Sequence, residues 1–299
     1  MDPTGLVQTG SALLLNSGFA WLVGSWFARL WVQSGETANS DVQSPLRWPD
    51  TVAAGLSLVG CIASLWAATA VMAGSGLIAA GTMLWPMLSA TDYGHAGSLT
   101  VALMSLIFAL RLYPSNHHRS QRFAVLILLA TFAATRASMG HAGEAGLWSI
   151  AMAVETVHLW SIGLWAGVVA VSGWQVLSIA TRAKLNIDDR YYLERMSRAA
   201  MYAVIAIAAS GLYNSWLRVG TLENLQDTSY GITLLVKIAL VVVAIVLGGY
   251  NKYIGLPAAV RSPQAQKHVR TVLQIESLVL FGVLAAAAIL TAQQPPSAM

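Results

Sequence analysis

Charge is scarce in this chain of 299 residues, and cysteine is almost absent. Only 10% of the residues are charged, against roughly a quarter in an average soluble domain. So few charged side chains cannot cover the surface of a soluble fold of this length. The one cysteine, Cys61, excludes an intrachain disulfide and a thiolate cluster for zinc or for iron and sulfur. Because Cys61 lies in an apolar run, we expect it to pack as a small apolar side chain.

The motifs of common enzyme classes are missing as well. No P-loop, dinucleotide-binding glycine fingerprint, pair of catalytic carboxylates or Ser-His-Asp order occurs in a fitting context. The basic residues form no nucleic-acid-binding motif either. The sequence therefore predicts a protein that is neither an enzyme nor a nucleic-acid-binding protein.

Apolar residues are abundant instead: they make up 56% of the chain, and the mean hydropathy is +0.61. A helix that crosses a bilayer needs about 20 mostly apolar residues. Segments that approach or exceed this length lie near residues 8–32, 50–75, 96–113, 121–140, 147–180, 195–218, 230–253 and 268–292. The sequence thus predicts an all-α, polytopic membrane bundle of about eight transmembrane helices. The first segment lacks the basic start and cleavage site of a signal peptide, so we expect it in the mature protein.

Lysine and arginine gather in alternate connections between these segments. The basic groups are Arg29 and Arg47; Arg111, Arg119 and Arg122; Arg182, Lys184, Arg190, Arg195 and Arg198; and Lys252, Arg261, Lys267 and Arg270. The intervening loops hold only Arg136 and Arg218. Because cytoplasmic loops carry the excess of lysine and arginine, we expect the four basic connections in the cytoplasm and both termini outside.

A short internal repeat divides the chain. Residues 75–77 (SGL), which lead to 91–94 (TDYG), are echoed by 210–212 (SGL), which lead to 228–231 (TSYG). The repeat predicts two related four-helix halves. Since each half holds an even number of spans, they would be parallel repeats about an axis along the membrane normal.

These halves are residues 1–140 and residues 141–299. The first half also contains an apolar stretch, 76–90, of about 15 residues, which is too short to span comfortably. It lies in an outward connection, so we expect it at the membrane interface or as a re-entrant segment.

Four ionisable residues fall inside predicted spans: Glu155, His158, Lys237 and Glu276. A charge in a bilayer is costly unless it is paired, so each is a functional candidate. Glu155 and His158 have the i, i+3 spacing by which bundles direct a carboxylate and an imidazole at one metal ion; a hydrogen-bonded structural pair is the alternative. Lys237 and Glu155 lie roughly 10 to 12 Å below the outer ends of their spans, which predicts an intramembrane ion pair. Glu276 lies nearer the inner side, without an evident partner.

Imidazole and thioether side chains gather at the predicted outer end. His95 and His141 each lie in a Gly-His-Ala-Gly tetrapeptide, and Met83, Met87 and Met139 are near them in the sequence. Met83 and Met87 are spaced i, i+4 and would share a helix face. Such donors favour copper, as Cu(I) or Cu(II). The alternative for any single methionine is packing in an apolar core.

Several motifs occur together in residues 138–296. They are GHA at 140–142, VHLW at 157–160, LWAG at 164–167, TSYG at 228–231, LLVK at 234–237, Asn251, Arg270 with Glu276, and the ending LT at 290–291 with PP at 295–296. With this set the chain resembles the copper-resistance D (CopD) family of bacterial inner-membrane proteins. The first half is more loosely similar, mainly through residues 91–94.

The resemblance implies an eight-span inner-membrane protein of copper homeostasis and resistance, with copper uptake as its expected activity. Its implied partner is a periplasmic copper-binding protein of the CopC type, and its termini would be periplasmic. His141, His158, Lys237 and Glu276 fall on family motifs. His95, Met83 and Met87 are particular to this chain.

Three functions remain open from the sequence. The leading interpretation is copper transport or handling, with capture at His95, His141 and the methionines and passage past His158 and Glu155. The second is a haem-binding electron-transfer bundle, which needs axial ligands, usually paired histidines on facing helices. The third is a subunit that delivers copper without transporting it.

Overall fold

The computed structural model describes residues 2–33, 43–113, 119–178, 189–259 and 262–296. Within these ranges the chain is helical and forms no strand. Eight of the described helices have at least 20 residues, and each coincides with one predicted apolar segment. They are α1 (Pro3–Gln33), α2 (Gln43–Met72), α4 (Asp92–Leu112), α5 (Arg119–Ser138), α7 (Ile150–Val171), α9 (Asp189–Val219), α11 (Ser229–Tyr250) and α13 (Pro263–Thr291).

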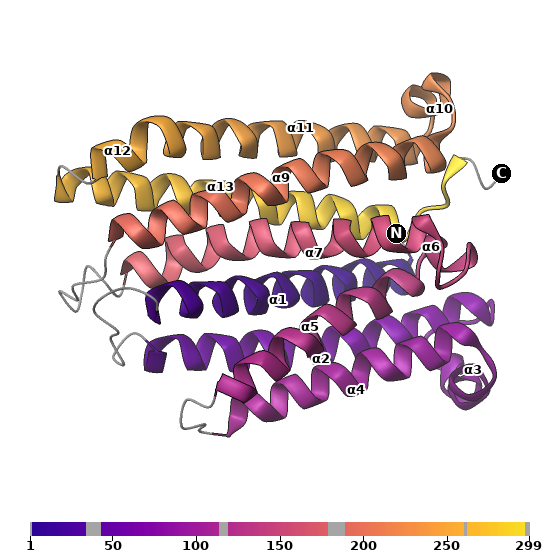
Figure 1. Cartoon of the computed structure of the whole chain (residues 1–299). Coiled ribbons are helices and arrows are strands. Elements are labelled where there is room, and N and C mark those ends of the chain that lie inside the picture. Colours follow the sequence, from indigo (N-terminus) through magenta and orange to yellow (C-terminus); the bar gives the residue numbers. More distant parts are fainter. Residues whose placement is uncertain (1, 34–42, 114–118, 179–188, 260–261, 297–299) are drawn as a thin grey trace.

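The long helices run side by side as one bundle (Figure 1). Among the described residues, seven helices are long and apolar enough to cross a membrane. The remaining long helix, α5, is not one of them, and it carries Arg122 and Arg136 near its two ends. An all-helical membrane bundle is therefore confirmed, and the count of eight spans stays a prediction.

Short helices gather at one end of the bundle, together with both chain termini (Figure 1). They are the 3-10 turn η2 (Ala79–Met83) with α3 (Leu84–Ala90), α6 (His141–Glu144) and α10 (Leu222–Asp227). The apolar stretch 76–90 thus forms η2 and α3, and α3 lies across the end of the bundle. The helix α12 (Leu256–Ala259) lies at the opposite end.

The repeated tetrapeptides form the same helix start twice. The Thr91 hydroxyl accepts from Gly94 N and donates to Met87 O, which joins α4 to α3. The Thr228 hydroxyl likewise accepts from Gly231 N and donates to Asn224 O, which joins α11 to α10. A side-chain oxygen that accepts from a free N–H of the first turn is the usual N-cap. The sequence repeat is thus a structural repeat at these two helix starts, and the division into halves stays a prediction.

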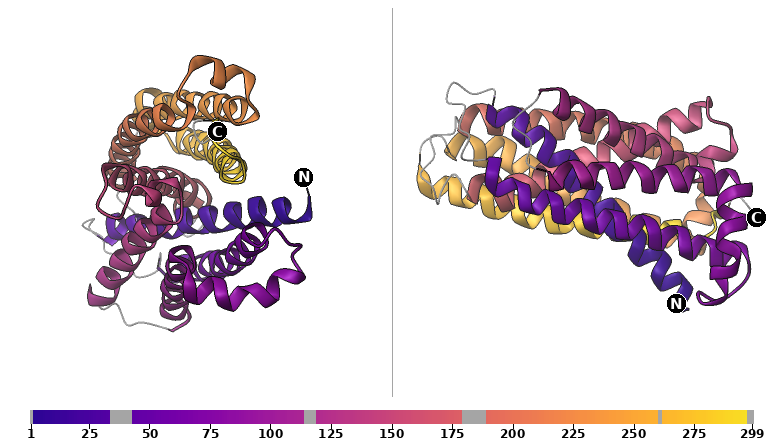
Figure 2. Two further views of the ribbon diagram at one scale, coloured as in Figure 1. Left: turned by 90° about the vertical axis from the view of Figure 1, so that its right-hand side faces the viewer. Right: turned by 90° about the horizontal axis from the view of Figure 1, so that it is seen from below.

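Helix α1 and helix α7, which belong to the first and the second predicted half, cross closely. A Cβ added to Gly167 would overlap the backbone carbonyl of Ala20, and one added to Gly24 would overlap the backbone of Gly167. Figure 2 shows the N-terminal helices on one side of this crossing and the C-terminal helices on the other. Small residues permit close approach of two helix backbones in membrane bundles. The glycines therefore set the distance between the two groups of helices.

At the same end of the bundle as α12, a polar cluster links the three helices α1, α2 and α4. Asp50 on α2 is fully buried, and its carboxylate receives the Arg29 guanidinium at 2.9 Å and that of Arg111 at 3.8 Å. The indole N–H of Trp21 donates to the same carboxylate at 3.2 Å. The sequence analysis treated Arg29 and Arg111 only as topology signals. In the structure they also hold α1 and α4 to α2.

Two of the long helices continue into π-turns at their inner ends, the ends nearest α12. They are η3 (Ser172–Val176) after α7 and η4 (Asn251–Gly255) after α11. A π-turn inserts an extra residue into a helix and occurs often at functional sites. Both turns contact α13.

The helix crossing gives a first testable prediction. Gly167→Ala places a methyl group against the α1 backbone, so we expect it to lower the stability of the folded protein by about 1 to 3 kcal/mol, the usual cost of overpacking. Thermal unfolding of the detergent-purified protein measures this. Gly10→Ala is the control, because a Cβ there meets nothing within 4 Å. Equal melting temperatures of the two variants would contradict the crossing.

Candidate functional site

A polar cluster lies near the outer ends of three long helices, the ends nearest α6 and α10. Ser149 caps α7 by accepting from Met152 N, so Glu155 and His158 lie in the second and third turns. Helix α9 ends at Val219, followed by Gly220 with φ +73°, a conformation that favours glycine at helix ends. Helix α11 contributes Lys237.

The carboxylate of Glu155 is bound by two donors from α9. Its Oε2 accepts from Asn214 Nδ2 and from Arg218 Nη2, each at 2.8 Å. Asn214 and Arg218 are spaced i, i+4, so they present their donors on one helix face. The second oxygen, Oε1, has no hydrogen bond within the described part of the chain. Glu155 therefore keeps one oxygen free for a ligand.

Glu155 was expected to pair with Lys237, but its ion-pair partner in the structure is Arg218. The sequence analysis assigned Arg218 to a loop because it stands at the end of an apolar segment. Helix α9 includes it, and the long guanidinium side chain reaches across to α7. Lys237 is half-buried and has no hydrogen bond or ion pair among the described residues, although Glu155 attracts it over a longer distance.

His158 is buried, and its hydrogen bonds define which ring nitrogen is free. Its Nδ1 lies 2.9 Å from Ser210 Oγ, and that hydroxyl lies 2.6 Å from Ala206 O. Because the hydroxyl proton goes to the Ala206 carbonyl, Ser210 Oγ accepts from Nδ1–H. The Nε2 atom of neutral His158 then carries a lone pair and has no partner in the described residues. A histidine held by its other ring nitrogen in this way is prepared to bind a metal ion.

The two outer-end histidines lie on different helices, His95 in the first turn of α4 and His141 at the start of α6. His95 Nε2 lies 3.1 Å from Ser89 O, which orients the ring beside α3. His141 Nδ1 lies 3.2 Å from Glu144 Oε1, and its side chain is half exposed. Both rings keep one nitrogen without a hydrogen bond to described residues. The described part of the chain holds no group of three or more His, Cys, Asp or Glu side chains in metal-binding proximity.

The three candidate methionines have different surroundings. Met83 is 50% exposed and Met87 only 6%, so the pair does not present two sulfurs on one surface. The reason is a change of helix type: Met83 ends η2, and α3 begins at the next residue. The sulfur of Met139 lies 3.5 Å from Thr100 Oγ1 and 3.7 Å from Arg136 Nη1, which hold it between α4 and α5. Met83 is therefore the most accessible of the three.

Glu276 has a partner that the sequence analysis missed. The indole N–H of Trp165 on α7 donates to Glu276 Oε1 on α13 at 3.1 Å, and both side chains are 2% exposed. Trp165 lies in the interior, where a buried indole N–H needs an acceptor.

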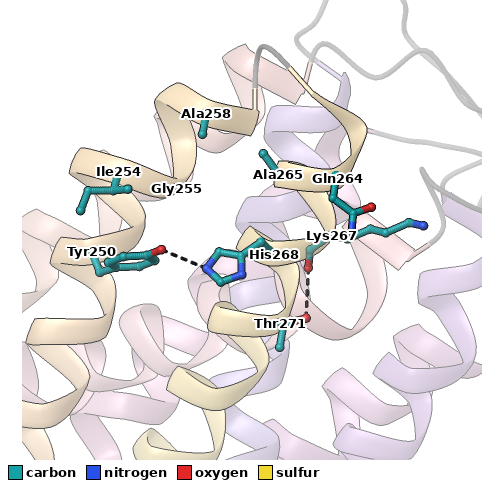
Figure 3. A pocket seen from close by; sticks show the side chains of 9 residues that line it. All are labelled: Tyr250, Ile254, Gly255, Ala258, Gln264, Ala265, Lys267, His268 and Thr271. Atoms are coloured by element: carbon teal, nitrogen blue, oxygen red, sulfur yellow. Dashed lines mark hydrogen bonds between the residues drawn. The ribbon is translucent and has the colours of Figure 1, made fainter.

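A separate groove of about 560 Å³ lies between η4, α12 and the start of α13. Figure 3 shows the Tyr250 hydroxyl and the His268 ring pointing toward each other across it, and the Tyr250 Oη to His268 Nε2 distance is 3.0 Å. His268 is thus fixed by a helix-to-helix contact at the inner end of the bundle.

Comparisons with known proteins point to copper. Residues 2–150 match the family described as Copper resistance protein D-like, N-terminal domain, and residues 190–290 match Copper resistance protein D. A curated relative, the "Copper transport protein CutJ" of Bacillus subtilis (strain 168), is 25% identical over 210 residues. The matched region is 67% of this chain and 37% of that relative, so the chain spans little more than a third of its length. No solved structure matches the chain.

The Glu155 contacts give a second prediction, for a double-mutant cycle. Arg218→Met strands the Glu155 carboxylate, and Glu155→Gln removes the stranded charge, so we expect the double variant to recover part of the lost stability. The coupling energy should lie in the range of about 0.5 to 3 kcal/mol found for contacting residues. Thermal unfolding in detergent measures it. A Glu155→Gln and Lys237→Met cycle is the comparison, and a larger coupling there would contradict the observed pairing.

Proposed function

Because this chain belongs to the copper resistance D family, we propose that it carries copper across the bacterial inner membrane, in the direction of uptake. The observation that supports this most is His158, a buried imidazole with Nδ1 held by Ser210 and Nε2 without a hydrogen bond among the described residues. Imidazole nitrogen is a common copper ligand. Copper is the cargo in this proposal, and no resident cofactor is part of it.

The orientation follows from the distribution of charge. Basic residues are concentrated at the end of the bundle that includes α12, which the positive-inside rule assigns to the cytoplasm. The termini and the short helices α3, α6 and α10 lie at the other end (Figure 1), which we assign to the periplasm. Helix α5 lies alongside the seven apolar helices and serves as the eighth span, with its arginines near its ends.

Copper would enter from the periplasmic end in two steps. His95, His141 and Met83 are exposed side chains with nitrogen or sulfur donors, suited to capturing Cu(I) or Cu(II) from a periplasmic carrier of the CopC type. From there the ion would pass to His158, with the free Oε1 of Glu155 one helical turn away on α7. Arg218 neutralises the carboxylate while the site is empty, which lowers the cost of keeping Glu155 charged in the bundle.

Copper titration of the detergent-purified full-length chain tests this proposal. We expect His158→Ala to bind one copper ion fewer per chain than the wild type, because its imidazole supplies a central ligand. His268→Ala should bind as the wild type does, because that ring lies in the separate inner groove. A His95→Ala, His141→Ala double variant should bind copper more weakly at the outer end.

Two outcomes would contradict the proposal. One is unchanged copper binding by His158→Ala. The other is a haem absorption band without copper in the wild-type sample, which would move the protein to the electron-transfer class.

A further inference from the structure

A second cavity, of about 200 Å³, lies in the inner half of the bundle. It is bordered by α7, α9, α12, α13 and the junction of α11 with η4. Most of its lining is apolar, but Glu276, Asn251, Lys252 and two methionines, Met196 and Met201, also border it. A cavity of this kind, apolar with a few converging polar groups, is typical of a binding site.

Glu276 presents a carboxylate to this cavity. Trp165 donates to Oε1, and Oε2 has no hydrogen bond within the described chain. A Cβ on Gly248 would come within 3.1 Å of Oε1, so the absence of a side chain at that position gives the carboxylate its room. Glu276 is only 2% exposed. A buried carboxylate is costly unless a positive charge or further donors reach it.

Asn251 is a second buried group that lacks partners. The residue is 2% exposed, and neither Oδ1 nor Nδ2 has a hydrogen-bond partner among the described residues. It is the first residue of the π-turn η4. Buried amides are nearly always hydrogen-bonded, so an unpartnered one calls for a ligand or water that completes it.

The two methionines add soft donors from α9. Met196 is 3% exposed and borders the cavity directly. The Met201 sulfur lies 2.7 Å from the Lys252 ammonium. The cavity thus already holds one positive charge, the Lys252 ammonium, next to the Met201 thioether. A bound cation could displace this lysine side chain.

We infer that this cavity is an inner Cu(I) site, formed by the sulfurs of Met196 and Met201, the Glu276 carboxylate and the Asn251 amide. Thioether donors select Cu(I) over harder ions, and the carboxylate balances its single charge. The identity of the metal rests on the proposed function. The site itself is additional to the outer cluster and uses a different set of residues.

The position of the cavity fits a second copper-binding site on the path that starts at His158. His158 and Trp165 are seven residues apart on α7, so they lie on the same face at a separation of about 10 Å. On the inner side, the cavity and the groove of Figure 3 lie on opposite sides of η4: Asn251 and Lys252 line the cavity, and Tyr250 and Gly255 line the groove. Copper bound at Glu276 would lie between the outer cluster and this inner groove.

Anaerobic Cu(I) titration against a chromogenic chelator tests the inner site in the full-length protein. We expect two tightly bound ions per wild-type chain and one in Glu276→Gln or in the Met196→Leu, Met201→Leu double variant. The affinity of the lost site should fall at least tenfold. Met104→Leu, a fully buried methionine in the core of the first half, is the control and should bind two ions. Lys252→Gln should bind Cu(I) more tightly at the inner site, because it removes the competing ammonium.

Retention of the His158-dependent ion in the inner variants shows that they are folded. X-ray absorption of copper-loaded His158→Ala should show sulfur ligands that disappear when Met196→Leu and Met201→Leu are added.

The outcomes separate the two proposals. If the inner variants bind two ions with wild-type affinity, or if the wild type binds one ion that depends on His158 alone, the inner site is wrong and the proposed function stands. If the single ion depends on Met196 and Met201 but not on His158, the inner site stands and the outer route is wrong. A wild type that binds no copper contradicts both.

Discussion

A carboxylate inside a membrane bundle needs donors other than bulk water, and this requirement decides which helices of the chain must stay together. Glu155 on α7 is held from α9, Glu276 on α13 is held from α7, and Asp50 on α2 is held from α1 and α4. Separating any of these helices would leave a buried charge without its partner, which costs more than the contact contributes. The acids therefore act as connections between helices as well as candidates for chemistry.

Helix α7 takes part in two of these three connections, those of Glu155 and Glu276. Its Gly167 crosses α1 and joins the two sequence halves, its His158 and Glu155 form the outer cluster with α9, and its Trp165 reaches the inner cavity. The buried polar groups proposed to carry copper come from α7, α9, η4 and α13. The N-terminal helices contribute two of the exposed outer-end donors, Met83 and His95.

The helices were predictable from the sequence, whereas several side-chain partners were not. Apolar length alone locates each long helix, as with the segment 96–113 and α4, because a spanning helix must be apolar over a fixed distance. The hydrogen-bond partner of a side chain depends on which neighbouring helix directs an acceptor toward it. Arg218 stands at a segment end, like a loop residue, and the sequence indicated no partner for Glu276, yet Arg218 and Trp165 both donate to buried carboxylates. The i, i+4 spacing of Met83 and Met87 places both side chains on one face only in a continuous α-helix, and the chain changes helix type between them.

Movement of Cu(I) into sealed liposomes that contain the purified protein tests the central claim most directly. The account predicts accumulation of copper in liposomes with the wild type, and a fall to the rate of protein-free liposomes when His158→Ala and Glu276→Gln are combined. His268→Ala, outside both sites, should accumulate copper at the wild-type rate. A wild type that binds copper but accumulates none would contradict transport and identify the protein as one that holds or delivers the metal.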